Sequence, residues 1–231
     1  MIQISNLSKK YSETVVFSDL NYTFENACIY GLVGRNGAGK TTLLNILSNY
    51  DKNYTGVISI DRKKMNKVDY LDMPVAYAMD QPSFFNELTI YENLLLIASS
   101  RKIKKQEAFD KIERILDGLG LKKYENYSPL ELSKGTMQRL NNACAMIQEE
   151  KITIFDEPFS GLDPVQMKLL ENVIVEFHKK EKGIYIISSH DIECLQNVCD
   201  KCLLLHNGQI REINMEEVDR EEIAKILSEG E

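Results

Sequence analysis

Two patterns of hydrophobic and polar positions divide the chain into three stretches. Short apolar, β-branched or aromatic runs broken by polar residues fill residues 1–81 and return at 149–231, whereas residues 82–148 place apolar side chains at helical spacing. Runs of the first kind predict strands, and apolar residues three and four apart predict amphipathic helices. Strands that alternate with helices favour a mainly parallel sheet. The pattern therefore predicts an α/β fold in which residues 82–148 form an inserted helical subdomain.

Local signals predict the individual elements. In the first stretch we expect an antiparallel β layer and then a buried core strand: 2–4, 15–17, 22–24 and 57–60, then 75–79. Thr89 and Glu92 have the spacing of a capping box at the start of a helix, and a second helix is expected at 105–119. The last stretch predicts strands at 152–155, 183–187 and 202–205, and helices at 165–181, 191–200 and 215–228. Asn207-Gly208 is a hairpin turn signal.

A glycine-rich loop stands between the buried run Ile29–Val33 and an apolar helix pattern. It is a G-x-x-x-x-G-K-T phosphate loop and reads Gly34-Arg35-Asn36-Gly37-Ala38-Gly39-Lys40-Thr41-Thr42. Its glycines let backbone N–H groups face an anion, and the following helix adds the positive end of its dipole. Lys40 supplies a charge for the β- and γ-phosphates, and the Thr41 hydroxyl can bind Mg²⁺. The loop predicts a site for a nucleoside triphosphate and Mg²⁺.

A second strand ends in two carboxylates that suit nucleotide hydrolysis. The apolar run at 152–155 is followed by Asp156 and Glu157. Asp156 is placed to hold Mg²⁺, directly or through water. Glu157 is placed to orient or deprotonate the attacking water. Because the carboxyl ends of parallel strands share one edge of a sheet, both side chains are expected near the phosphate loop.

Three further residues are candidates because of where they stand. Gln81 follows the core strand at 75–79, where its amide can contact the metal and the water. His190 ends the strand that begins at residue 183, where a neutral imidazole can bind the γ-phosphate. Tyr11 precedes the first pair of strands and can stack on adenine. Each of the three, taken alone, also fits an ordinary surface residue.

Charge and cysteine content narrow the class of protein. The 231 residues include 28 basic and 35 acidic side chains, a net charge of −7, which argues against non-specific nucleic-acid binding. Five cysteines without a secretory signal fit reduced thiols in a cytoplasmic protein, and no apolar stretch is long enough to span a membrane.

Cys199-x-x-Cys202 with His206 has metal-ligand spacing, but the two cysteines belong to different predicted elements, so ordinary buried thiols are expected. The basic run at 101–105 is expected to be a solvated helix junction.

Ser133 is a good N-cap for a helix inside the helical subdomain. The N-terminus of that helix could point at a phosphate, but it is expected to lie far from Lys40 of the same chain. A second copy of the chain would be needed to bring Ser133 to a bound nucleotide.

Together these motifs resemble the ATP-binding subunit of an ABC transporter, in the family's order and over essentially the whole chain. The matches are Walker A at 34–42, the Q-loop at Gln81, the signature motif from Leu132 to Gly135, Walker B at 152–157, the D-loop at Ser160–Asp163, the switch histidine at His190 and the adenine-stacking position at Tyr11. The resemblance implies one ABC ATPase domain at 1–231: a P-loop NTPase core with a mainly parallel sheet, an N-terminal antiparallel β layer and an inserted α-helical subdomain. It also implies ATP and Mg²⁺ as ligands.

The resemblance further implies partners. Two such subunits, identical or homologous, close head to tail on two ATP molecules. Each ATP then lies between the Walker A loop of one chain and the signature residues Ser133 and Gly135 of the other, and Asp163 of the D-loop belongs to the same nucleotide-binding set. Hydrolysis reopens the pair and moves a separate transmembrane permease subunit. This places the chain in the cytoplasm at the inner face of the cell membrane.

Three positions depart from the family's pattern. Lys134 stands where the signature motif has its first glycine, Thr136 stands where it has glutamine, and Thr153 puts a hydroxyl into the Walker B strand. Ser133 and Gly135 are retained, so the phosphate-facing serine and the close backbone approach are kept. Lys134 can face either the partner's nucleotide or the solvent.

Three functions remain open at this point. The first is a transporter ATPase, and the altered signature with the stretch 157–164 most resembles ATPases of drug, antimicrobial-peptide or lantibiotic exporters. The second is a soluble single-cassette ATPase in macromolecular or cofactor assembly. The third is a nucleotide-binding regulatory module without turnover, against which Glu157 and His190 argue. The sequence favours the first hypothesis, a transporter ATPase. In that case the permease would select the substrate.

Overall fold

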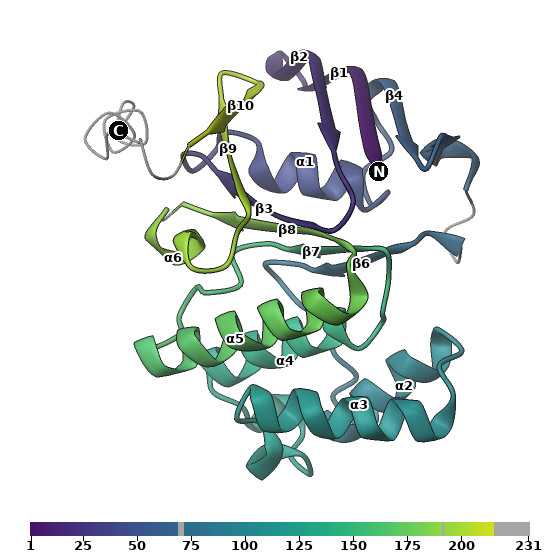
Figure 1. The fold of residues 1–231 in the computed structure, drawn as a ribbon, viewed down its shortest axis with the longest axis vertical. Coiled ribbons are helices and arrows are strands. Elements are labelled where there is room, and N and C mark those ends of the chain that lie inside the picture. The colour runs from purple at the N-terminus through teal and green to yellow at the C-terminus, as the bar shows by residue number, and fades with distance from the viewer. Residues whose placement is uncertain (69–71, 191, 215–231) are drawn as a thin grey trace.

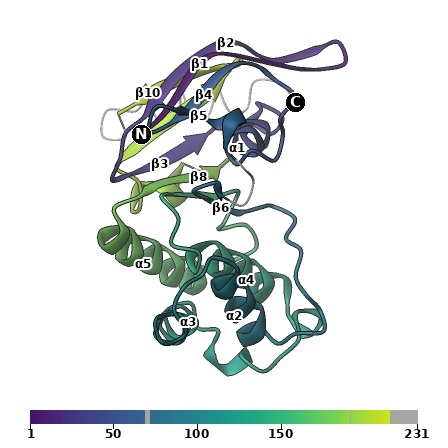
Figure 2. The same ribbon diagram turned by 90° about the vertical axis from the view of Figure 1, so that its right-hand side faces the viewer.

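The computed structural model describes residues 1–68, 72–190 and 192–214. Figures 1 and 2 show three layers: an antiparallel sheet above, a larger and mostly parallel sheet in the middle, and a group of helices below. This confirms the predicted α/β fold with a separate antiparallel layer. The helix predicted at 215–228 lies outside the described residues.

The antiparallel sheet has the strand order β2-β1-β4-β5. Its strands are β1 (Ile2–Tyr11), β2 (Thr14–Phe24), β4 (Thr55–Ile60) and β5 (Lys63–Lys64). The two short strands predicted at 15–17 and 22–24 are one strand, because the polar residues between them are absorbed by irregularities in the pairing with β1. Asp19 lies there with a φ of 50°, as residues in β-bulges often do.

The middle sheet has the order β10-β9-β3-β8-β7-β6, and only β10 runs antiparallel to its neighbour. The strands are β3 (Cys28–Val33), β6 (Val75–Ala78), β7 (Ile152–Phe155), β8 (Ile184–Ser189), β9 (Lys201–His206) and β10 (Gln209–Ile213). β9 and β10 are joined through Asn207 and Gly208, both at positive φ, so the predicted hairpin is confirmed. The carboxyl ends of β3, β6, β7 and β8 share one edge, and the candidate site lies there.

The helices follow the expected order. They are α1 (Lys40–Leu47), α2 (Ile90–Ser100), α3 (Lys105–Gly118), α4 (Lys134–Met146), α5 (Pro164–Glu181) and α6 (Glu193–Gln196), with 3₁₀ turns at Met65–Lys67, Lys122–Tyr124 and Pro129–Glu131. The capping box at Thr89 and Glu92 is confirmed. α6 is much shorter than the helix predicted at 191–200, because Asp200 already pairs with Ile29 at the start of β3 through its amide and its carboxylate, each at 2.8 Å.

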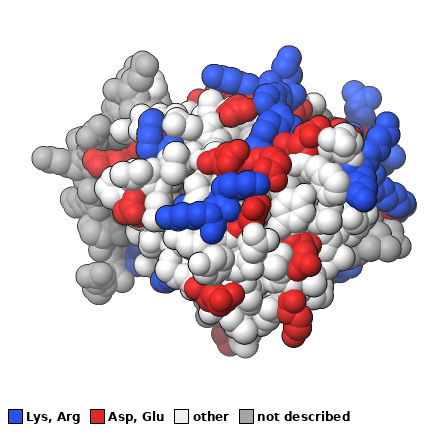
Figure 3. Space-filling model, turned by 90° about the horizontal axis from the view of Figure 1, so that it is seen from below, with Lys and Arg blue, Asp and Glu red and all other residues white. Residues whose placement is uncertain are grey.

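Two hydrophobic cores lie on the two faces of the middle sheet. Alternating residues of β3 serve both: Ile29 and Val33 pack with α2 to α5, whereas Tyr30 and Leu32 pack with α1 and the antiparallel sheet. All six residues of β3 are buried, as expected for a parallel strand covered on both sides. Seen from below, the helical side of the molecule carries acidic and basic side chains interspersed with one another (Figure 3).

The basic run at 101–105 is only partly a solvated junction, and the expectation is wrong for Arg101. Its guanidinium donates to Gln148 (2.9 Å) and to the Val75 carbonyl (3.2 Å), and it forms an ion pair with Glu150 (3.1 Å). Arg101 therefore fastens the end of α2 to the start of β6.

Candidate functional site

The phosphate loop lies between β3 and α1, as the motif requires. Gly37 and Gly39 have φ values of 81° and 101°, which side chains rarely adopt. A Cβ at Gly39 would also stand 2.7 Å from a methyl carbon of Val16, so this position excludes any larger residue. A Cβ at Gly37 would meet no atom within 4 Å, so its requirement is conformational alone.

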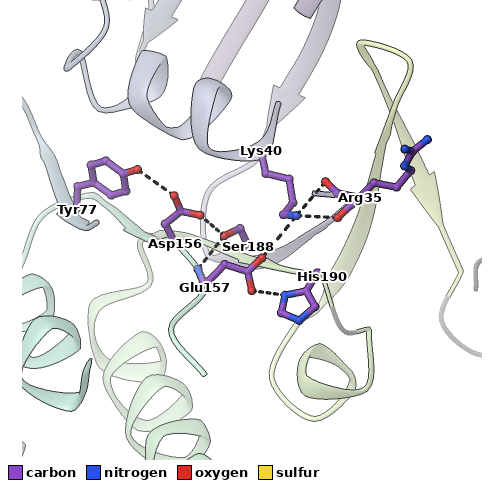
Figure 4. A network of polar contacts seen from close by, with 8 residues as sticks. Arg35, Lys40, Tyr77, Asp156, Glu157, Ser188 and His190 are labelled. Atoms are coloured by element: carbon purple, nitrogen blue, oxygen red, sulfur yellow. Dashed lines mark hydrogen bonds and ion pairs between the residues drawn. The ribbon is translucent and has the colours of Figure 1, made fainter. Parts of the chain in front are cut away.

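Lys40 lies at the base of this loop and turns back toward it (Figure 4). The side chain is 6% exposed, and its ammonium donates to the carbonyl oxygens of Gly34 (2.7 Å) and Arg35 (3.3 Å). The same ammonium stands 3.5 Å from a carboxylate oxygen of Glu157. The lysine predicted to bind phosphate and the predicted base are thus in contact.

Asp156 is buried at the end of β7, and its two carboxylate oxygens are held differently. Oδ1 accepts a hydrogen bond from the Ser188 hydroxyl (2.5 Å), and Oδ2 lies 3.4 Å from the Tyr77 hydroxyl. Burial raises the pKa of Asp156, while hydrogen bonds from Ser188 and Thr41 oppose that rise. A carboxylate and a threonine hydroxyl are oxygen donors of the kind that Mg²⁺ prefers, so Asp156 and Thr41 together fit this ion.

Glu157 is held from three sides. Its backbone N–H donates to the Ser188 hydroxyl (2.9 Å), one carboxylate oxygen contacts His190 Nδ1 (2.9 Å), and the other faces Lys40. Its φ is 50°, a left-handed conformation that costs free energy for a residue with a side chain and that persists where the surroundings enforce it. The structure therefore brings Lys40, Glu157 and His190 together at one point.

Lys40, Glu157 and His190 line one cleft of about 550 Å³ at the carboxyl edge of the sheet, whereas the buried Asp156 is not part of its lining. Its lining includes much of the predicted set: Tyr11, Arg35, Asn36, Gly37, Gly39, Lys40, Thr41, Thr42, Glu157 and His190. Gln81 is not part of this lining, and its neighbour Asp80 is. The negative charge of Asp80 also helps to raise the pKa values of Asp156 and Tyr77. Asp80 therefore lies at the cleft next to Gln81 in the chain, and contact of the Gln81 amide with the metal and the water stays a prediction.

Tyr11 stands at the mouth of the cleft with half of its surface exposed. Its hydroxyl donates to Asp51 (3.1 Å), and the ammonium of Lys9 lies 4.5 Å from the centre of its ring. Lys9 is almost fully buried and forms an ion pair with Asp51 at 2.7 Å. The ring is thus fixed in place while its surface remains accessible, as a stacking platform requires.

The signature residues lie elsewhere, at the start of α4, and are not part of the cleft lining. Ser133 is the N-cap, and its hydroxyl accepts from the amide of Thr136 (3.3 Å). A Cβ at Gly135 would stand 3.0 Å from the Gly161 carbonyl oxygen, so this glycine lets α4 approach the D-loop closely. Lys134 is exposed, and its carbon stem lies over Gly161.

Two further predicted features have clear places. Asp163 is the N-cap of α5 and accepts from the amide of Gln166 at 2.9 Å. Thr153 is buried in β7, and its side chain partly opposes the burial that raises the pKa of Tyr185. Within the described ranges 1–68, 72–190 and 192–214, no cluster of three or more metal-ligating side chains is found, and the cysteines are free thiols.

The model of the family described as "ABC transporter" matches residues 17–160. The chain belongs to the ABC transporter family. It is an ATP-binding cassette, an ATPase. No helix in the described part of this cassette is long and apolar enough to cross a membrane.

Curated relatives of the cassette carry transporter names. It is 31% identical to an uncharacterized ABC transporter ATP-binding protein of Methanocaldococcus jannaschii, over 90% of this chain and 75% of the relative. It is 30% identical to the bacitracin transport ATP-binding protein BcrA of Enterococcus faecalis, over 95% and 71%. It is 29% identical to the tungstate uptake system ATP-binding protein TupC of Peptoclostridium acidaminophilum, over 91% and 97%.

Solved ABC cassettes share the fold. The structure of an ATP-binding subunit of an ABC transporter superimposes with a TM-score of 0.85 at 26% identity, covering 99% of this chain and 95% of that one. A dimeric cassette in a post-hydrolysis state, bound to ADP and Pi, gives a TM-score of 0.81 at 22% identity over 93% and 98%, which shows the likeness of fold alone.

Sequence reasoning missed three polar residues of this ABC site, namely Asp80, Tyr77 and Ser188. Ser188 is fully buried in a strand of otherwise mostly apolar residues. A buried hydroxyl requires a partner, and that requirement was a signal present in the sequence. Its partners, the Asp156 carboxylate and the Glu157 amide, became visible only in three dimensions.

Proposed function

We propose that this ABC ATPase binds ATP with Mg²⁺ in the described cleft, closes head to tail with a second cassette, and hydrolyses the nucleotide to power transport through a separate transmembrane permease. The observation that carries the proposal is Glu157, held within contact distance of both Lys40 and His190 at the edge of the phosphate loop. A cassette that only bound nucleotide would not need a carboxylate fixed at that place in a strained backbone conformation.

The residue roles follow from the positions in the cleft. Backbone amides of the loop 34–42 and the ammonium of Lys40 bind the phosphates, once Lys40 exchanges its carbonyl partners for them. Thr41 and Asp156 hold Mg²⁺, which neutralises phosphate charge when bound. Glu157 orients or deprotonates the attacking water, and His190 steadies Glu157.

The second half of the site comes from a partner cassette. Ser133 and Gly135 do not reach the cleft of their own chain, yet the Ser133 hydroxyl and the start of α4 form an exposed anion-binding end of a helix. In a head-to-tail dimer this end faces the partner's γ-phosphate, with Asp163 nearby. Residues 1–231 act as one domain, in which the helical segment 82–148 presents Ser133 to the partner.

An exposed apolar patch supports a permease partner. Phe85, Tyr127 and Leu130 are 58%, 45% and 74% exposed. Their two segments are joined, because the Ser128 hydroxyl donates to the Asn86 carbonyl at 2.8 Å. One segment leads back to Asp80 in the cleft and the other leads on to the signature residues. A cytoplasmic helix of the permease docked here would therefore sense both halves of the nucleotide site, at the inner face of the membrane.

The direction of transport rests on the sequence of the signature and D-loop region. Relatives at 29–30% identity carry the names of a tungstate uptake system and of bacitracin transport. The stretch 157–164 and the altered signature resemble exporter ATPases, so we propose export.

The substitution Glu157→Gln tests the proposal. It keeps the shape and removes the base, so phosphate release should fall about 10²- to 10⁴-fold, and the variant should form a stable dimer with MgATP but not with MgADP, measured by light scattering. Unchanged turnover in the variant would remove Glu157 from its role. A wild-type chain that binds ATP without releasing phosphate would instead support a regulatory module.

The permease contact has its own test. The wild-type chain should co-purify with a membrane protein, and the substitution Leu130→Glu should abolish that co-purification.

A further inference from the structure

The altered signature motif contains a chain of hydrogen bonds that ends on the phosphate-facing serine. Thr136 occupies the position where the family has glutamine, and it is 3% exposed. Its hydroxyl lies 2.9 Å from the hydroxyl of Ser133 and 3.3 Å from Nη2 of Arg139. Thr136 is therefore an internal residue that links a buried arginine to an exposed serine.

Arg139 fixes the direction of this chain. The residue is 5% exposed, and its guanidinium donates to the carbonyl oxygens of Leu119 (2.7 Å) and Gly120 (3.3 Å), which anchors it to the end of α3. A guanidinium can only donate hydrogen bonds, so the Thr136 oxygen must be the acceptor in its contact with Arg139. The single proton of the Thr136 hydroxyl is then free to point toward Ser133.

Ser133 consequently has its accepting capacity filled from inside the protein. Its oxygen accepts from the backbone amide of Thr136 and, in this arrangement, from the Thr136 hydroxyl as well. A hydroxyl has two lone pairs and one proton, so the proton that remains on Ser133 points outward. An outward-pointing O–H is what a phosphate oxygen accepts, whereas outward lone pairs would repel it.

We propose that Thr136 is a positioning residue, which relays hydrogen bonding from Arg139 so that Ser133 presents its proton to the γ-phosphate of the nucleotide on a partner cassette. Hydrogen bonds in such a series polarise one another, and the first donor here carries a full charge in a dry site. The relay takes the place of the glutamine that the signature motif usually has. The inference rests on the proposed function, because it requires a partner cassette whose nucleotide meets α4.

The test uses the full chain with Glu157→Gln as background, so that ATP-dependent dimers accumulate. Thr136→Val is nearly isosteric and removes only the hydroxyl, whereas Thr136→Ser keeps the hydroxyl and serves as the matched variant. We expect Thr136→Val to weaken MgATP-dependent dimerisation about fivefold, measured by analytical ultracentrifugation, and Thr136→Ser to stay within about twofold of the background, since one neutral hydrogen bond is worth about 1 kcal/mol. MgATP affinity of the monomer should be unchanged in both variants, which also shows that they are folded.

Epistasis with Ser133 separates the relay from simple packing. Ser133→Ala should weaken dimerisation by itself, and adding Thr136→Val to it should have no further effect, because the relay acts only through Ser133. Equal dimer affinity of Thr136→Val and its background would overturn the inference, as would a Thr136→Ser variant as weak as Thr136→Val. Failure of the Glu157→Gln background to dimerise would instead overturn the proposed function, so the two failures are distinguishable.

Discussion

Lys9 and Asp51 form a buried ion pair beneath the Tyr11 ring. We predict that losing one of these two residues destabilises the fold more than losing the other. The Lys9 side chain is 2% exposed and that of Asp51 is 17% exposed, with 2.7 Å between ammonium and carboxylate. Asp51 has other donors, namely the Tyr11 hydroxyl at 3.1 Å and the Asn53 amide at 2.9 Å. Without Asp51, Lys9 keeps only the Asn53 carbonyl at 2.6 Å and the face of the Tyr11 ring. Removing the carboxylate should therefore cost more than removing the ammonium.

The magnitudes follow from what each substitution leaves behind. Asp51→Asn leaves an unpaired buried cation, and breaking a buried pair in this way costs about 3–5 kcal/mol. The ceiling is about 4.6 kcal/mol at pH 7, because an unpaired lysine can lose its proton at that cost. Lys9→Met leaves a partly exposed carboxylate with two donors, which costs about 1–3 kcal/mol. The double variant leaves no charge and should cost less than Asp51→Asn alone.

The pH dependence of stability separates the effect of charge from the effect of lost packing. In Asp51→Asn the cost of neutralising a lysine falls to about 2 kcal/mol at pH 9, so the variant should recover stability between pH 7 and pH 9. In the wild type, burial raises the pKa of Asp51, but hydrogen bonds from Lys9, Asn53 and Tyr11 outweigh this and lower it. A depressed carboxyl pKa stabilises the fold above the pKa of the unfolded chain, and that contribution is lost as the pH falls below about 4.

Urea unfolding followed by circular dichroism at pH 3, 7 and 9 measures all of these differences. The wild type and Lys9→Met are the controls at each pH. The reasoning fails if Lys9→Met is the more destabilising of the two single variants at pH 7, or if the penalty of Asp51→Asn does not change between pH 7 and pH 9.

Three further predictions concern other parts of the molecule. Ser188→Ala should lower ATP hydrolysis about 10- to 100-fold at saturating MgATP, since its hydroxyl joins the Asp156 carboxylate to the Glu157 amide; Thr153→Val removes a buried hydroxyl from the next strand and should retain activity. Gly118→Ala should destabilise by about 1–3 kcal/mol, because its Cβ would stand 2.7 Å from a Val173 methyl carbon, and Val173→Ala should reverse part of that loss in urea unfolding. Burial raises the pKa of the Cys202 thiol to about 12, and the residue is fully buried, so this thiol should stay unmodified by a disulfide reagent at pH 8 until urea exposes it, as mass spectrometry would show.

Features encoded locally could be predicted from the sequence. The phosphate loop needs only its own glycines and Lys40, and the turn at Asn207-Gly208 needs only those two residues, because each is set by backbone conformations that few residues adopt. Strand β7 could also be predicted together with the two carboxylates at its end. The apolar run is short and stops at Asp156, so the end of the strand cannot be placed elsewhere.

Features that depend on the exact end of an element could not be predicted. β6 ends at Ala78, and the chain then bends, so Asp80 lines the cleft and Gln81 does not. Successive side chains of an extended segment point in opposite directions, and an offset of one residue exchanges which of them faces the site. The motif predicts Gln81 as a contact of the metal and the water, which stays a prediction, and it gave no indication that the neighbouring Asp80 lines the cleft. Long-range partners such as Ser188 are hidden for a related reason, since nothing local indicates which strand lies beside β7.

The contact between Lys40 and Glu157 links nucleotide binding to catalysis in the proposed cycle. In the structure, the ammonium of Lys40 is shared between the loop carbonyls and the Glu157 carboxylate. Phosphate oxygens compete for the same ammonium and offer it more charge than either partner. When they displace Glu157, the carboxylate keeps only His190 at 2.9 Å and becomes free to accept a proton from water. In the proposed cycle, each chain thus prepares its own base by binding ATP, while Ser133, the proposed donor to the phosphate, comes from the partner cassette.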